Sequence, residues 1–162
     1  MKETAIQLLV LTKSAKPRLL SISEAKAGEK PLAEKWSLKE ILGHLIDSAT
    51  NNHHRIVRMQ ASADIGTFTY EQEHWVNSQH YQEEQWENVV ELWYRYNVHV
   101  AHVIAHVDEA SLNNRCDMGY EIPAPLRFVI EDYVRHVQHH LDQIFSGAKP
   151  LERKRWMAKR PS

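Results

Sequence analysis

The 162-residue sequence lacks an excess of charge, a set of paired cysteines and a long hydrophobic run, and each absence excludes a class of protein. Lys and Arg number 20 against 21 Asp and Glu, so no net field favours nucleic acid or a membrane surface as a partner. The single cysteine, Cys116, excludes an internal disulfide and is typical of a reducing cytoplasm. No apolar stretch is long enough to span a bilayer, and the first residues do not resemble a signal peptide.

The sequence motifs of several common enzyme classes are also missing. There is no G-x-S-x-G nucleophile elbow, no P-loop and no Rossmann fingerprint. The composition departs from the ordinary only in its eleven histidines, which suit either metal binding or a polar surface. Their spacing has to separate these two interpretations.

Apolar residues at spacings of three and four predict four long helices. The second helix begins at Ser37, which forms a capping box with Glu40. Pro17 predicts a kink or a break near Ala15 in the first helix. Gly147 is typical of a helix end, which the following proline reinforces. The helices are expected over residues 4–21, 37–60, 85–107 and 126–146.

The connections between these helices differ in length. Ser21–Lys35 is polar and is expected to hold a short turn at Ser23–Ala27. Ala61–Glu84 has no sustained period and contains several aromatic residues, so we expect a long loop between the second and third helices. Asp108–Pro125 is expected to form a loop or a small hairpin. The fold class is therefore all-α, a four-helix bundle.

We assign residues 1–148 to this single bundle domain and residues 149–162 to a basic C-terminal tail. The tail carries six basic residues against Glu152. Without a recognition-helix pattern or an aromatic-rich sheet, a solvated tail is favoured over nucleic-acid binding.

The pair His136 and His140 is the strongest candidate for a metal site. Four residues apart on a helix, their side chains project about 40° from each other and can bind one ion. On the second helix, His44 shares a side with Ser48 and Asn51 and is displaced from the apolar stripe in the same rotational sense as the pair. His44 is therefore a candidate third ligand. The alternative is ordinary histidines at the edges of buried helix faces.

Other candidates are weaker. His99, His102 and His106 are spaced as a helical row, but they lie opposite the apolar stripe of the third helix, which predicts a solvated face. Cys116 has no partner at helical spacing, and a lone cysteine is usually inert.

Two segments, Lys35–Ser48 (KWSLKEILGHLIDS) and Tyr133–Ile144 (YVRHVQHHLDQI), resemble the DinB-like superfamily and look closest to its YfiT-type branch of metal-dependent hydrolases. The resemblance covers most of the chain. It implies a four-helix bundle, often a homodimer, that binds zinc or nickel through three histidines. At the matching positions these are His44, His136 and His140.

The resemblance also bears on the reaction. Residues 70–75, YEQEHW, are similar to a family stretch near the metal, so Trp75 is expected to wall the pocket. Some relatives are thiol transferases that join bacillithiol or a similar thiol to electrophiles. We therefore expect a zinc- or nickel-dependent hydrolase or thiol S-transferase that activates water or a low-molecular-weight thiol against a small molecule. The alternative is a non-catalytic, metal-binding dimeric bundle.

Three further residues are candidates for supporting the ligands. A metal-bound imidazole needs an acceptor for its second ring nitrogen. Glu40 and Asp132 each precede a candidate ligand by four residues, although solvated charges are the simpler interpretation. Gln143 shares the histidine face of the last helix and is expected to hydrogen-bond a metal-bound ligand.

Overall fold

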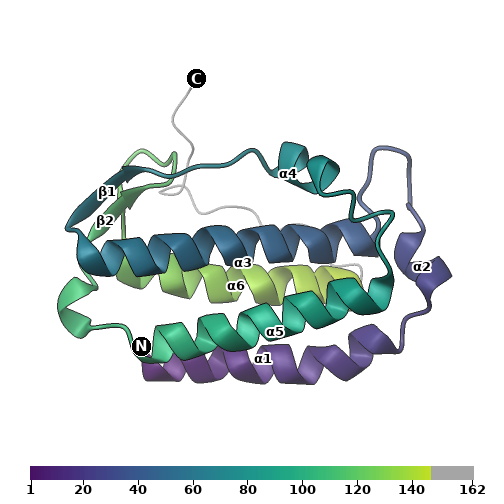
Figure 1. The fold of residues 1–162 in the computed structure, drawn as a ribbon, viewed down its shortest axis with the longest axis horizontal. Helices are drawn as coiled ribbons and strands as arrows, with labels where there is room; N and C mark the ends of the chain where they lie inside the picture. The colour runs from purple at the N-terminus through teal and green to yellow at the C-terminus, as the bar shows by residue number, and fades with distance from the viewer. Residues whose placement is uncertain (147–162) are drawn as a thin grey trace.

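The structure, a computed structural model, describes residues 1–146 and is helical apart from a small sheet (Figure 1). Each of the four long helices packs against two of the others, so they form a closed bundle in the order α1, α5, α3, α6. This confirms the predicted four-helix bundle. None of the helices within the described residues has the length and apolar character needed to cross a bilayer. The bundle helices are α1 (Lys2–Leu20), α3 (Leu38–Ala61), α5 (Trp86–Ala105) and α6 (Leu126–Ser146).

Short elements fill the connections. The short turn expected after α1 is present as α2 (Glu24–Gly28), and the Ser23 side chain accepts from the backbone N–H of Lys26 in its first turn. A three-stranded sheet lies at one end of the bundle and α2 at the other (Figure 1). In this sheet β1 (residues 64–67) pairs in parallel with β2 (residues 115–117), and β2 pairs antiparallel with β3 (residues 124–125). The remaining short elements are β1 (Asp64–Thr67), α4 (Gln72–Ser78), a 3₁₀ turn (Glu109–Ser111), β2 (Arg115–Asp117) and β3 (Ala124–Pro125).

The small hairpin expected within residues 108–125 is confirmed by β2 and β3. The segment 61–84 was expected to be a loop, yet it contains β1 and α4. Helix α4 is shorter than two turns, and β1 is four residues long and depends on a strand partner about 50 residues away. Neither element is long enough to produce a periodicity over ten or more residues. The predicted tail 149–162 and the helix stop at Gly147 lie outside the described residues.

Of the kink or break predicted near Ala15, the break is wrong. Helix α1 continues through Pro17 to Leu20, and the carbonyl of Pro17 still accepts a hydrogen bond from the backbone N–H of Ser21 at 3.2 Å. Proline removes one backbone donor, and only one turn of helix follows it. The helix therefore loses the hydrogen bond of one N–H group and continues for three residues after Pro17.

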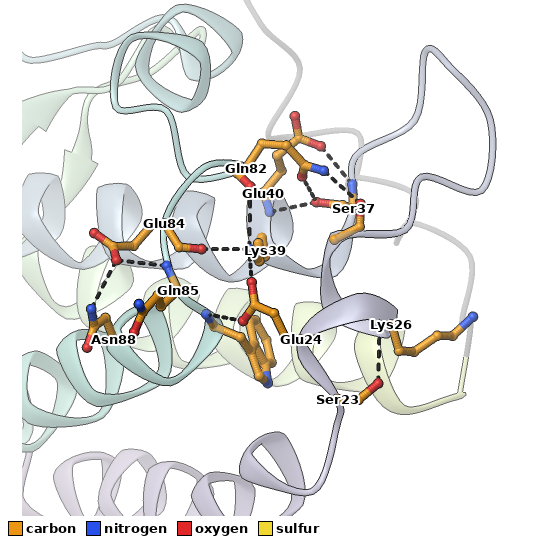
Figure 2. A network of polar contacts seen from close by, with 12 residues as sticks. Ser23, Glu24, Lys26, Ser37, Lys39, Glu40, Gln82, Glu84, Gln85 and Asn88 are labelled. Atoms are coloured by element: carbon orange, nitrogen blue, oxygen red, sulfur yellow. Dashed lines mark hydrogen bonds and ion pairs between the residues drawn. The ribbon is translucent and has the colours of Figure 1, made fainter.

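The N-terminus of α3 is held by two polar networks (Figure 2). The capping box is present as predicted: Ser37 Oγ accepts from the Glu40 backbone N–H at 3.2 Å, and the Glu40 carboxylate accepts from the Ser37 N–H at 2.8 Å. Beside it, the ammonium of Lys39 donates to the Glu24 carboxylate and to the carbonyl of Glu84 at 2.6 Å. Lys39 is only 5% exposed, so one cation joins α2, α3 and the segment before α5.

The segment after α4 is positioned by a close contact between the Tyr81 ring and the backbone of α3. The ring of Tyr81 lies directly on the backbone of Gly43 in α3, where a Cβ atom would come within 2.2 Å of Tyr81 Cδ2. No side chain larger than hydrogen fits there without movement of the ring or the helix. Gly43 is therefore required by packing.

Replacing Lys39 by Met should destabilise the fold by about 2 kcal/mol, because the carbonyl of Glu84 and the carboxylate of Glu24 lose the charged donor that joins them to α3. The matched control is Lys26→Met, which breaks an exposed ion pair with Glu29 and should cost no more than about 0.5 kcal/mol. Urea unfolding measures both free energies. Equal losses in the two variants would contradict a structural role for the Lys39 network.

Gly43→Ala should lower the free energy of unfolding by about 1–3 kcal/mol, the usual range for an overpacked site. Gly28→Ala is the control, because its added Cβ would meet nothing closer than 3.7 Å, at Gln82 Nε2. Thermal unfolding should therefore separate the two alanine variants. A Gly43→Ala protein as stable as Gly28→Ala would show that the Tyr81 ring does not need its present position.

Candidate metal centre

Three histidines from two helices converge inside the bundle. His44 comes from α3, and His136 and His140 come from α6, where their spacing of four residues places them on one side. Each histidine offers a ring nitrogen, and the three nitrogens all lie within 4.8 Å of one another. The Nε2 atoms of His44 and His136 are 3.1 Å apart. The structure thus brings together all three of the residues named as candidate ligands from the sequence.

The three rings differ in their access to solvent. His44 is 1% exposed, whereas His136 and His140 are half-buried. The rings meet edge to face, with centroid separations of 4.5–5.1 Å. His136 and His140 are therefore the more accessible members of the cluster, and His44 is the innermost.

Gln143 fixes the protonation of one candidate ligand. The Nδ1 atom of His140 lies 2.8 Å from Gln143 Oε1, and an amide oxygen can only accept, so Nδ1 carries the proton. The lone pair of His140 is then on Nε2. Burial also lowers the pKa of His140, an effect that the Gln143 hydrogen bond opposes. The lowered pKa favours the neutral imidazole, which is the form that binds a metal ion.

Trp36 is a neighbour of the cluster that the sequence reasoning missed. Its ring centroid lies 5.2 Å from that of His44, at an angle of 40°. Trp36 precedes the capping residue Ser37 and so lies outside the helix, where helical periodicity cannot place a side chain. The available signal was its position in the Trp-Ser pair at the start of the segment KWSLKEILGHLIDS.

The two carboxylates expected near the imidazoles have other partners. Glu40 accepts from the Ser37 backbone and from the ammonium of Lys30 at 2.7 Å, at the N-terminus of α3. Asp132 accepts from Arg135 at 2.8 Å. The role of both residues as acceptors for imidazole stays a prediction.

Trp75 lies beside Tyr70, with ring centroids 5.4 Å apart, and contributes to a pocket of about 290 Å³. None of the three histidines lines this pocket. The residues that line it are Thr50, Asn51, His54, Phe68, Thr69, Tyr70 and Trp75.

The competing histidine row does not form a comparable cluster. His99 and His102 on α5 and His106, the residue that follows it, are exposed, as predicted. Among residues 1–146, His44, His136 and His140 form the only group of three or more potential ligands that meets at one point. Cys116 is buried, and burial raises the pKa of its thiol, so it remains protonated.

A four-helix bundle with three histidines converging from two helices defines a recognisable class of protein. The model of the DinB superfamily matches residues 8–144, so the chain belongs to that superfamily. The fold also matches the solved structure of YfiT from Bacillus subtilis with a TM-score of 0.74 and 15% sequence identity, over 88% of this chain and 83% of that one. YfiT is described as "a probable metal-dependent hydrolase with an unusual four-helix bundle topology". No curated protein matches the chain.

One turn beyond His44, a buried carboxylate joins α3 to the segment after α4. Asp47 is 1% exposed, and its Oδ1 atom accepts from the Tyr81 hydroxyl at 2.8 Å and from the Gln79 amide. Burial raises the pKa of Asp47 from 3.8 to about 6, although these two hydrogen bonds act in the opposite direction. The native state therefore keeps a proton on Asp47 at pH values where the unfolded chain has lost it.

This shift predicts how stability depends on pH. The contribution of Asp47 is fully present below about pH 4 and is lost as the pH rises to about 6, at most about 3 kcal/mol. Asp47→Asn keeps an acceptor for Tyr81 and should remove this loss, whereas Glu87→Gln, at an exposed position, should leave the profile unchanged. Unfolding free energies measured from about pH 4 to pH 7 test this. Parallel profiles for wild type and Asp47→Asn would contradict it.

Proposed function

We propose that the chain is a metal-dependent enzyme that binds zinc or nickel through His44, His136 and His140. The observation that carries the proposal is the convergence of three imidazole nitrogens from α3 and α6. With Zn–N bonds of about 2.1 Å in a tetrahedral site, neighbouring ligand atoms lie about 3.4 Å apart. The separation of 3.1 Å between the Nε2 atoms of His44 and His136 is close to this value, so the residues fit the ion.

The number and charge of the ligands favour a catalytic role. Structural zinc sites are usually closed by four protein ligands, whereas catalytic sites keep a position open for water or substrate. The cluster supplies three ligands, all imidazoles, which carry no charge when they bind a metal ion. An ion held in this way keeps its full charge and lowers the pKa of water or of a thiol that reaches it.

Residues around the triad orient the ligands. Gln143 holds His140 in the tautomer that presents Nε2, and an amide does this without adding negative charge. The Trp36 ring packs against His44 and restricts both its rotation and the access of water. Cys116 is buried, and burial raises the pKa of its thiol, so we do not propose this cysteine as the nucleophile.

The reaction we propose is hydrolysis of a small electrophilic substrate. Membership of the DinB superfamily and the fold shared with YfiT, which is described as "a probable metal-dependent hydrolase", support it. The alternative reaction is transfer of a low-molecular-weight thiol to the same kind of substrate. It would use the same three ligands, with a thiolate in place of water as the nucleophile. Product analysis with and without an added thiol distinguishes the two reactions.

Metal binding and turnover test the proposal together. After incubation with zinc or nickel and dialysis, the wild type should retain about one equivalent by mass spectrometry, and His44→Ala should lose at least about 100-fold in affinity. A panel of ester, amide and thiol-plus-electrophile assays should show turnover that the same substitution abolishes. The matched control is His102→Ala, which removes an exposed histidine from α5.

Two results would contradict the proposal. One is a wild-type protein that stays metal-free after incubation with either ion. The other is a His44→Ala protein that binds the ion as tightly as the wild type does.

A further inference from the structure

We propose that the pocket between α3 and residues 68–75 binds one end of the substrate, and that this end is a flat, uncharged ring. This rests on the proposed function, because it takes the histidine triad as the place where the substrate reacts. The pocket of about 290 Å³ lies at the small end of the range for small-molecule sites. It has room for a ring system but not for a whole cofactor.

The lining determines the chemistry of the occupant. Three aromatic side chains, Phe68, Tyr70 and Trp75, provide the apolar surface, and no Asp, Glu, Lys or Arg is among the lining residues. Apart from His54, the lining offers a charged group no ionic partner to replace the hydration that it would lose there. A planar ring can instead stack against the aromatic walls. Thr50 Oγ1 and Asn51 Nδ2 each donate to the carbonyl of Asp47, at 2.9 and 2.8 Å, so their oxygen atoms remain as acceptors for a hydroxyl on that ring.

The walls of the pocket are fixed by contacts outside it. Arg55, which is buried, donates to the carbonyl of Phe68 at 2.7 Å and 3.2 Å and so holds this segment against α3. The Tyr70 and Trp75 rings brace each other edge to face. Because Arg55 is used by the backbone and does not line the pocket, its charge does not make the pocket an anion site. The pocket is therefore formed before any ligand arrives.

The position of the pocket on α3 relates it to the triad. Asn51 follows His44 by seven residues, so the two lie on the same side of the helix, about 10 Å apart along its axis. A substrate that reaches both is elongated, with its reacting group about two helical turns from the ring. This predicts selection for neutral aryl substrates over short aliphatic ones.

Binding of small probes tests the pocket directly. We would titrate the zinc-loaded protein with 2-naphthol, 2-naphthoate and 2-naphthylmethylammonium, which share a ring and differ in charge. The indole N–H signals of the five tryptophans report binding by NMR, and a Trp75→Leu variant assigns the signal of Trp75. We expect 2-naphthol to shift that signal and to bind at least about 10-fold more tightly than either charged probe.

Two tryptophan substitutions on one helix provide the matched comparison. Thr50→Trp fills the pocket and should weaken 2-naphthol binding at least about 10-fold. Val57→Trp adds the same bulk to α3 at a position that is 48% exposed and outside the lining, and it should leave binding unchanged. If Thr50→Trp does not fold, Trp75→Leu, which removes an aromatic wall, should also weaken binding. Zinc content should be the same in all of these proteins.

The possible failures are distinguishable. Unchanged 2-naphthol binding in the pocket variants, with zinc still bound, would overturn the pocket assignment and leave the metal-dependent function standing. Equal binding of the three probes would overturn the selection for an uncharged ring. A pocket that binds 2-naphthol in a protein that binds no metal would overturn both the proposed function and the assignment of the pocket to its substrate.

Discussion

The packing of α3 against α6 is the constraint on which the candidate site depends. His136 and His140 are brought together by helical geometry alone, but His44 meets them only if α3 lies in one register along α6. Displacement of α3 by one residue would move His44 by 1.5 Å along the axis and rotate it by about 100°, away from the pair. The contacts that fix the N-terminal half of α3 are therefore also contacts that build the triad.

Several of those contacts are close to His44 in sequence. The capping box at Ser37 sets where α3 begins, Lys39 ties it to α2 and to the segment before α5, and Gly43 receives the ring of Tyr81. They are polar or steric rather than simply apolar, so they define position and not only burial. An apolar interface alone would let α3 shift along α6 by amounts that would separate the three histidines.

What could be predicted from the sequence follows the range of the interactions. The four helices, the capping box and the pair on α6 are encoded in local periodicity, and the rotational position of His44 was readable from its own stripe. The proximity of Trp36 to His44 and the pairing of β1 with β2 depend on the closed fold, and no local pattern reports them. At Pro17 the local pattern predicted too much: proline favours a break, but α1 continues through it to Leu20.

The triad draws on residues 92 positions apart in the chain, and this separation has a consequence for folding. Helix α6 presents two imidazoles as soon as it is helical, whereas the third arrives only when the bundle has closed. An ion bound by all three would connect two helices that are far apart in the sequence. Because the unfolded chain does not hold the three imidazoles together, binding would favour the native state by mass action. The same atoms that would serve the chemistry would thus make the resistance of the bundle to heat depend on the supply of metal.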